Sequence, residues 1–373
     1  MMTNKKNYIY DLETYPNFFC GVFKCKDEDI VFEISARVND YDMMCDFYEN
    51  EIKYAIGFNN VKFDAQIMQY LINNREQFNQ MQGSQLVKLI FDFAQSVIQK
   101  SRDKEFLPFA EWNTTVPQID LYAINHYNNK ARITSLKWIE FSINHDRVQD
   151  LPYKFDRNLR LEQFDHVIDY CKNDVRATRN FAEKCMDLIK LRISQDKQYP
   201  ELRLRNKPDS SVGETLFLHF MSESMGIDKK VLKQMRTERE SMPIKDILLP
   251  YINFKTEEFN LIHNWYKNSM SGNLEQSVWY GGIEYVFGEG GIHASWENKI
   301  FEADDDFEII DIDVASFYPN LAIVNNFRPE HLGDSFMTVY KNLYEERKKY
   351  PKGSVENMSY KIILNGKINT FGI

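Results

Sequence analysis

The sequence predicts an α/β protein in two parts, and three observations support this prediction. The chain has 373 residues, of which 43% are hydrophobic, so it is long enough for more than one sizeable core. Strand-like segments come first in the N-terminal half, and segments of helical periodicity follow them. A polar stretch with two prolines, 194–211, then interrupts the pattern. We therefore expect a first domain over 1–193, a linker over 194–211 and a second domain over 212–373.

The first domain opens on a predicted β-hairpin. Residues 8–12 and 18–23 are apolar and aromatic, as strands usually are, and Pro16 and Asn17 between them supply turn chemistry. After the hairpin, hydrophobic periodicity predicts helices over 42–51, 65–72, 86–99, 136–141 and 162–189, and short apolar runs predict strands over 54–58 and 115–119. A mixed sheet with helices is the expected result.

The second domain has a more varied pattern. It begins with an apolar helix over 212–225 and a charged segment over 228–240. A glycine-rich zone over 281–291 follows, and an apolar strand is predicted over 307–314. No internal repeat is visible.

Composition narrows the class of protein. No stretch approaches the roughly 20 apolar residues that span a bilayer, and the polar first residues lack a secretory signal. Five cysteines without paired spacing support neither a disulfide framework nor a zinc site. We therefore expect a soluble cytoplasmic protein without a membrane partner. The net charge of −9 argues against non-specific adhesion to nucleic acid, although it does not exclude a local groove.

Four carboxylates and a phenol stand out along the first domain. Asp11 and Glu13 are two residues apart on a predicted strand, so both point to one face. Asp64 follows a short loop, and Tyr170 and Asp174 share one face of a predicted helix. Hard oxygen ligands of this kind hold pairs of Mg²⁺-like ions about 3.5 to 4 Å apart in phosphodiester hydrolysis. Taken singly, each residue is also explained as a solvated acid or a core tyrosine.

These segments resemble the three exonuclease motifs of the DEDDy proofreading 3′→5′ exonucleases, a likeness that covers residues 8 to about 190. The resemblance implies an RNase H-like fold, in which Asp11, Glu13, Asp64 and Asp174 bind metal and Tyr170 orients the attacking water. In the second motif, Asn60 and Phe63 would contact the single-stranded primer end.

A further short segment, 134–137, is similar to an element of protein-primed phage polymerases. The similarity implies that Ser135 and Lys137 assist strand binding. An ordinary helix N-cap followed by an exposed lysine explains the same residues equally well.

In the second domain, the string Asp-Ile-Asp-Val-Ala-Ser-Phe-Tyr-Pro-Asn over 311–320 resembles motif A of family B DNA polymerases. By this likeness Asp313 would bind both catalytic ions and Tyr318 would pack under the incoming sugar. The alternative is a core strand that ends in a turn. The glycines at 281–282 and 290–291 resemble template-binding segments, or they form turns between strands.

Motif B is only partly present. Lys361 and Asn365 match it, whereas Gly366, Ile368 and Asn369 depart from it. The Asp-Thr-Asp string of motif C does not occur in these residues, so a complete two-metal polymerase site is not expected from this sequence. A second polypeptide that carries motif C and a thumb is the hypothesis that follows.

The resemblance as a whole predicts the N-terminal part of a phage-like family B DNA polymerase. Its RNase H-like exonuclease domain would be followed by an incomplete α+β palm and fingers region. Two Mg²⁺ or Mn²⁺ ions per active site, a single-stranded DNA 3′ end, a primer-template and, in a completed polymerase, deoxynucleoside triphosphates are the implied ligands. If a phage encodes the protein, it works in the host cytoplasm. The alternative is a non-catalytic subunit that grips single-stranded DNA.

Overall fold

The computed structural model describes residues 5–235, 239–272, 274–288 and 291–368. It divides into two compact units. The larger unit contains the residues up to 227 together with those from 334 onwards, and the smaller unit contains 228–333. These bounds differ from the predicted domains, because the last helices of the chain pack with the N-terminal residues.

A mixed five-stranded sheet forms the centre of the larger unit, with the strand order β3-β2-β1-β4-β5. The first three strands are antiparallel, and β4 and β5 run parallel to β1. The strands are β1 (Lys6–Tyr15), β2 (Phe18–Cys25), β3 (Glu28–Ser35), β4 (Ile52–Gly57) and β5 (Gln118–Asp120). The predicted hairpin and both later strands are confirmed, whereas the edge strand β3 was not predicted.

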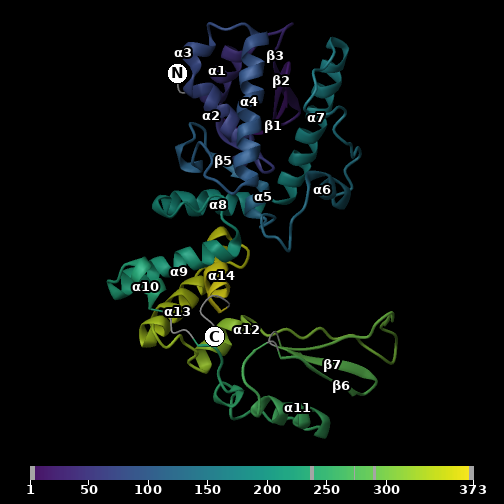
Figure 1. The fold of residues 1–373 in the computed structure, drawn as a ribbon. Helices are drawn as coiled ribbons and strands as arrows, with labels where there is room; N and C mark the ends of the chain where they lie inside the picture. The colour runs from purple at the N-terminus through teal and green to yellow at the C-terminus, as the bar shows by residue number, and fades with distance from the viewer. Residues whose placement is uncertain (1–4, 236–238, 273, 289–290, 369–373) are drawn as a thin grey trace. The chain divides into compact units, whose positions relative to one another are not determined.

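Helices cover both faces of this sheet, as Figure 1 shows. Alternate residues of β1 point to opposite faces. Tyr10 and Leu12 pack with the helices α1 (Tyr41–Glu51), α2 (Asp64–Asn73) and α4 (Gly83–Arg102). Ile9 on the other face packs with the long helix α7 (Leu161–Lys184). The larger unit is therefore an α/β fold with helices on each side of the sheet.

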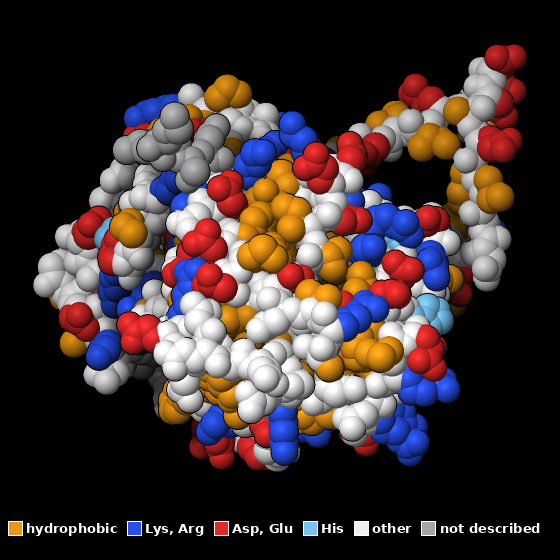
Figure 2. All heavy atoms as spheres, turned by 90° about the horizontal axis from the view of Figure 1, so that it is seen from above, with side chains coloured by type: hydrophobic (Ala, Val, Ile, Leu, Met, Phe, Trp, Pro, Cys, Tyr) orange, Lys and Arg blue, Asp and Glu red, His pale blue; other side chains and the backbone are white. Residues whose placement is uncertain are grey.

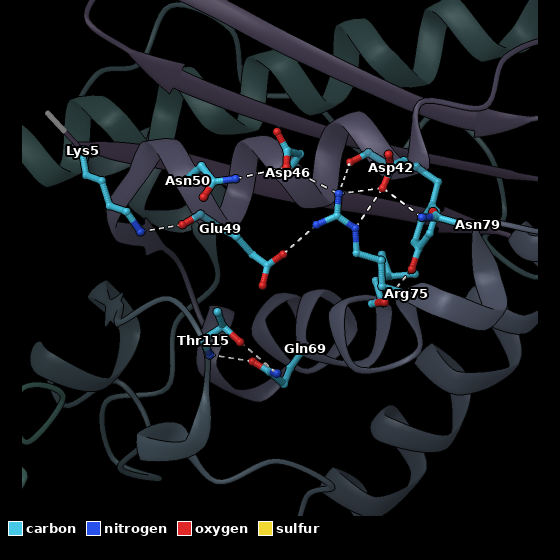
Figure 3. A network of polar contacts seen from close by, with 11 residues as sticks. Lys5, Asp42, Asp46, Glu49, Asn50, Gln69, Arg75, Asn79 and Thr115 are labelled. Atoms are coloured by element: carbon cyan, nitrogen blue, oxygen red, sulfur yellow. Dashed lines mark hydrogen bonds and ion pairs between the residues drawn. The ribbon is translucent and has the colours of Figure 1, made fainter. Parts of the chain in front are cut away.

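A polar network ties the helices of the first face together (Figure 3). Arg75, on the short helix α3 (Arg75–Phe78), bonds to Asp42 at 2.6 Å and to Glu49 at 3.0 Å, both on α1. Gln69 of α2 accepts the backbone N–H of Thr115 at 2.7 Å. These contacts tie α3 to α1, and α2 to the segment that leads into β5.

The second face contains more than one helix. The predicted helix over 162–189 is in fact two, because α7 ends at Lys184 and α8 (Met186–Gln198) begins after Cys185. Two shorter helices precede α7, namely α5 (Leu121–Ile124) and α6 (Leu136–Ser142). Ile139 of α6 lies in the same apolar cluster as Phe164 of α7.

The segment predicted as a linker is packed rather than free. α8 extends to Gln198, a 3₁₀ turn covers Pro200–Leu202, and α9 (Asp209–Met225) begins two residues before the predicted boundary at 211. Leu204 is fully buried. The Arg192 guanidinium is also buried and bonds to the carbonyl of Lys207 at 2.9 Å and to the carboxylate of Asp209. These contacts fasten α8 to the start of α9.

Two late helices complete the larger unit, α13 (Gly333–Lys348) and α14 (Val355–Ile368). The ring of Phe336 on α13 lies 5.1 Å from that of Phe217 on α9. Gln195 of α8 donates to the Ser359 hydroxyl of α14 at 3.1 Å. In the described part of the chain, no helix combines the length and apolarity that crossing a bilayer requires.

The smaller unit has an antiparallel sheet in the order β6-β7-β8. The strands are β6 (Gln276–Tyr280), β7 (Ile283–Gly288) and β8 (Gly291–Ala294). The α-helices of this unit are α10 (Lys229–Gln234), α11 (Glu257–Lys267) and α12 (Phe317–Val324). Gly281 and Gly282 form the turn between β6 and β7 with φ of 58° and 80°, a conformation that favours glycine. Within the predicted segments, Gly290, Asn369 and residues 236–238 lie outside the described residues.

The predicted strand over 307–314 is wrong. The described residues of this range form no strand, and Ile309, Ile310 and Ile312 are all exposed. An alternating apolar pattern favours a strand only where a neighbouring strand supplies hydrogen-bond partners, and none pairs with this segment in the structure.

Candidate active site

Asp11 and Glu13 lie on the part of β1 that extends beyond β4. β1 pairs with β4 only from Lys6 to Ile9, while its pairing with β2 continues to Tyr15. Asp11 and Glu13 therefore sit on a strand with one open edge, and they point to the face that α7 covers. Both are partly exposed.

Asp174 approaches them from α7. One carboxylate oxygen from each of Asp11, Glu13 and Asp174 lies within 4.8 Å of the other two. Such a grouping of carboxylates is typical of a divalent-cation site, because like charges at this spacing repel one another unless a cation or a proton intervenes. The three residues come from the first strand and a late helix, so only the tertiary fold brings them together.

Asp64 reaches the same strand from the opposite face. It is the first residue of α2, and its Oδ1 accepts the backbone N–H of Leu12 at 3.1 Å. This contact occupies an amide on the edge of β1 that β4 leaves unpaired. Asp64 is buried, and its charge is felt by both Asp11 and Glu13. The fourth predicted acid is thus a neighbour of the three-carboxylate group.

Burial raises the pKa of all four groups, and repulsion from neighbouring acids of the site adds to the rise at Asp11 and Glu13. Loss of solvation, followed by repulsion from the other acids, raises the pKa of Asp11 and Glu13 well above the usual range. Burial raises the pKa of Asp64 to about 7 and that of Asp174 to about 6. Each carboxylate would regain its ordinary acidity in the presence of a bound cation.

Tyr170 lies one turn before Asp174 on α7 and is buried. Its hydroxyl is close enough to the Asp174 carboxylate to lower the pKa of that acid against the effect of burial. Burial first, and then the negative charges of Asp174 and Glu13, raise the pKa of the tyrosine. The phenol therefore keeps its proton and acts as a hydrogen-bond donor beside the carboxylates.

A buried thiol links the helix to the strand. Cys171 donates to the backbone carbonyl of Asp11, with a sulfur-to-oxygen distance of 3.5 Å. This contact places the middle of α7 directly against β1. It helps to fix Asp174 and Tyr170 relative to Asp11.

The second predicted motif divides into buried and partly buried residues. Asn60 is fully buried, and its side-chain amide donates to Oε1 of Gln118 at 3.0 Å. Phe63 is partly buried and packs on the apolar cluster of α2 and α4. Asp120, at the end of β5, accepts the backbone N–H groups of Asn59 at 2.9 Å and Val61 at 3.3 Å. Together these contacts shape the loop that delivers Asp64.

The segment 134–137 also lies beside the carboxylates. The Ser135 hydroxyl caps α6 by accepting the Trp138 N–H at 3.2 Å. Lys137 forms an ion pair with Asp150 at 2.5 Å, and its positive charge lowers the pKa of both Glu13 and Asp174. The cap that the sequence suggested is present, and Lys137 is close enough to influence the site.

Glu140 is a residue that motif-based reasoning missed. It is 1% exposed, and neither carboxylate oxygen has a hydrogen-bond partner among the described residues. Burial, and secondarily the charge of Asp174, raise its pKa to about 7. The one sequence signal was its spacing of three residues from Lys137, which puts both side chains on one face of α6.

The residues predicted for nucleotide transfer divide between the two units. Asp313 and Tyr318 are exposed in the smaller unit, Asp313 in an irregular segment and Tyr318 in the first turn of α12. Lys361 and Asn365 are exposed on α14 of the larger unit. Among the described residues, Asp313 belongs to no cluster of acidic or other metal-binding side chains.

The donors at the first site fit a hard cation. All are carboxylate oxygens, which Mg²⁺ and Mn²⁺ prefer. The thiol of Cys171 is a neighbour of this group, with its sulfur 3.9 Å from Oδ2 of Asp11. Comparison with protein-family models and with curated proteins gives no match for this sequence.

Proposed function

We propose that the chain is a metal-dependent 3′→5′ exonuclease that acts on single-stranded DNA ends. The observation that carries the proposal is the convergence of Asp11, Glu13 and Asp174, with carboxylate oxygens within 4.8 Å of one another. Asp64 completes the proposed ligand set from the edge of β1. Two Mg²⁺ or Mn²⁺ ions would supply an activated water and stabilise the leaving oxygen.

The chain's own residues have distinct parts in this proposal. The four carboxylates hold the cations, and the protonated Tyr170 hydroxyl, beside Asp174, orients the attacking water. Lys137 adds positive charge where the phosphodiester would lie. Asn60 and Phe63 act through the loop before Asp64, and Ser135 holds the start of α6.

The order of these residues along the chain supports kinship with the DEDDy exonuclease domain of family B DNA polymerases. The mixed sheet with helices on both faces agrees with the RNase H-like fold that such kinship implies. The proposed kinship is thus supported by the order of the motif residues together with the topology of the sheet.

A non-catalytic subunit that merely grips single-stranded DNA is the rival. A phosphate-binding surface gains affinity from Lys and Arg, whereas clustered carboxylates repel phosphates unless cations neutralise them. Four acids with strongly perturbed acidity at one strand edge therefore favour catalysis over simple binding.

DNA synthesis is a second and separate part of the proposal. Asp313, Tyr318, Lys361 and Asn365 would serve it together with a primer-template, deoxynucleoside triphosphates and a second polypeptide that carries the missing carboxylate. The exposed apolar residues Ile309, Ile310 and Ile312 beside Asp313 support such an association, because exposed apolar runs are typical of protein contact surfaces.

The exonuclease is tested with a 5′-labelled single-stranded oligonucleotide and Mg²⁺ or Mn²⁺. We expect a ladder of products that shorten from the 3′ end, and no ladder with Asp11→Ala or Asp174→Ala. Glu76→Gln is the matched control, because it removes one exposed acid on α3, a helix that lies apart from α7. Retention of activity in both Ala variants would rule out this site.

A further inference from the structure

Two exposed aromatic rings stand side by side on α6. Trp138 and Phe141 are 63% and 66% exposed, and their ring centroids are 5.6 Å apart with an interplanar angle of 23°. The stacked rings of Tyr70 and Phe93, in contrast, pack on the buried cluster that contains residues of α4. Large apolar rings left together in solvent indicate a binding surface rather than a core contact.

The same helix borders the proposed active site. Ile139 packs in the apolar cluster of α7, and Glu140 lies buried within the electrostatic reach of Asp174. Lys137 influences both Glu13 and Asp174. α6 has seven residues and is therefore about 10 Å long. Lys137 and the two rings all lie on this helix, so the distance between them along its axis is less than this length.

The chemistry around the rings suits a nucleic-acid strand. Lys130 and Arg132 are exposed just before α6, and Lys137 lies on the helix itself, so cations for phosphates flank rings for bases. Every base has a π-face, and stacking on an aromatic side chain therefore needs no particular sequence. A strand whose 3′ end lies at the carboxylates has to continue past a neighbouring helix.

We propose that Trp138 and Phe141 form a stacking site for unpaired bases of the single-stranded DNA whose 3′ end enters the carboxylate cluster. This inference rests on the proposed exonuclease function and adds a base-binding site to it. The site holds bases by their faces, so it accepts any sequence and discriminates against a strand that lacks bases.

The test compares the full chain's affinity for an oligothymidylate and for an abasic oligonucleotide of equal length, measured by fluorescence anisotropy in Ca²⁺. We expect Trp138→Ala to weaken binding of the oligothymidylate by about 5- to 100-fold, the range for loss of one stacked base. Binding of the abasic strand should not change. Trp138→Phe keeps an aromatic ring and should restore most of the affinity, and Phe141→Ala should weaken it as Trp138→Ala does.

Trp112→Ala is the matched control, because Trp112 is similarly exposed at 58% but lies under the Arg203 guanidinium, in another part of the unit. It should leave both affinities unchanged. Equal affinity of Trp138→Ala and the unchanged chain for oligothymidylate would overturn the stacking site. So would an equal loss with the abasic strand, or an unchanged chain that binds neither strand.

The result separates this inference from the proposed function. Hydrolysis that depends on Asp11 but binding that ignores Trp138 would overturn only the stacking site. Base-dependent binding through Trp138 without any hydrolysis would support the stacking site and refute the exonuclease.

Discussion

At the scale of single residues, Tyr170 changes the acidity of its neighbour Asp174 in the candidate site. The Tyr170 hydroxyl, one turn away on α7, offsets part of the rise in the pKa of Asp174 that burial causes. In the proposed exonuclease the tyrosine is therefore a positioning residue for the water and for the acid, whereas the carboxylates are the proposed ligands.

Tyr170→Phe removes this hydroxyl but leaves all four acids. We expect exonuclease activity to fall by about 10- to 100-fold, the usual cost of losing a partner that orients a metal ligand. Mn²⁺ affinity, measured by titration calorimetry, should fall far less than in Asp174→Ala. An unchanged rate would remove Tyr170 from the mechanism.

Glu140 allows a prediction about stability. Its pKa is raised to about 7 by burial, so the folded chain favours the protonated form. The stability that the neutral group provides is complete below its unfolded pKa, near 4.5, and is lost as the pH rises through about 7. Glu140→Gln removes the ionisable proton and should stabilise the chain at about pH 8 by about 1 to 2 kcal/mol.

Denaturant unfolding at about pH 5 and about pH 8 measures this effect. The difference between Glu140→Gln and the unchanged chain should be large at the higher pH and small at the lower. Glu76→Gln, on the exposed surface of α3, should show no such pH-dependent difference. A gain of equal size at both pH values would mean that charge burial is not its cause.

Residues that belong to a sequence motif could be predicted as site residues from the sequence, whereas residues outside any motif could not. Asp11, Glu13, Asp64 and Asp174 follow a recognisable order, although their role as ligands stays a prediction. Glu140 follows none, because only the packing of α6 on α7 makes it buried and unpartnered. The burial of Asn60 likewise depends on Gln118, a residue far along the chain.

At the scale of elements, the site exists because β1 is longer than its parallel neighbour. Pairing with β4 stops at Ile9, so the backbone around Asp11 and Leu12 is free on that side. Asp64 occupies the Leu12 amide, and α7 covers the face to which Asp11 and Glu13 point. Carboxylates from both sides of the sheet thus meet at the open strand edge.

Hydrophobic periodicity predicted helices and strands well where one face of the element is buried, and poorly elsewhere. β3 was missed because acids interrupt it, and one of them, Glu33, is buried with its carboxylate bonded to Arg37 and Ser35. The range 307–314 alternates like a strand but has no strand beside it. Alternation of apolar residues indicates that a segment is able to form a strand, whereas its pairing in a sheet depends on residues distant in sequence.

The α8–α9 connection carries an element-scale prediction. Arg192 is fully buried and bonds to Gln195 at 3.0 Å, to the Lys207 carbonyl and to Asp209. Arg192→Met should destabilise the chain by about 2 to 4 kcal/mol, because it leaves these groups without their shared donor. Lys190→Met, which removes an exposed cation of the same helix, should change stability by less than about 0.5 kcal/mol.

Chemical denaturation gives both values, and limited proteolysis adds a local readout. In Arg192→Met, cleavage should become faster within 199–208, where a free linker was expected and a packed one is found. Equal proteolysis of both variants would show that this connection is held by other contacts.

At the scale of the whole molecule, the distribution of charge bears on how DNA could bind. On the face that Figure 2 shows, acidic and basic side chains are interspersed with apolar ones. The net charge of −9 therefore leaves room for local binding of a phosphate chain. We expect the attraction between the chain and DNA phosphates to depend on cations bound at the carboxylates and on a few lysines, rather than on a broad positively charged surface.

The two units allow the two proposed activities to be separated. Asp313 lies in the smaller unit and the three-carboxylate group in the larger. Asp313→Ala should therefore leave 3′→5′ degradation unchanged, while primer extension by the isolated chain should be negligible with or without this change. Robust extension by the pure, unchanged chain would show that another acid, such as Asp311, completes the polymerase site.

Metal binding should be visible in the stability of the whole chain. The pKa of Asp64 is raised to about 7 and that of Asp174 to about 6, so between about pH 4 and pH 7 the folded chain binds more protons than the unfolded one. Its metal-free stability must then fall as the pH rises through this range.

Cations reverse this loss because they bind the ionised carboxylates of the folded chain. At about pH 8, Mn²⁺ at a hundred times its dissociation constant should add about 2.7 kcal/mol, or roughly 5 to 10 °C in melting temperature. At about pH 5 protons compete, and the gain should shrink. Calorimetric melting with and without Mn²⁺ measures both. Asp174→Asn should be more stable than the unchanged chain at about pH 8 without metal and should gain little from Mn²⁺; an equal gain in both chains would place the cation elsewhere.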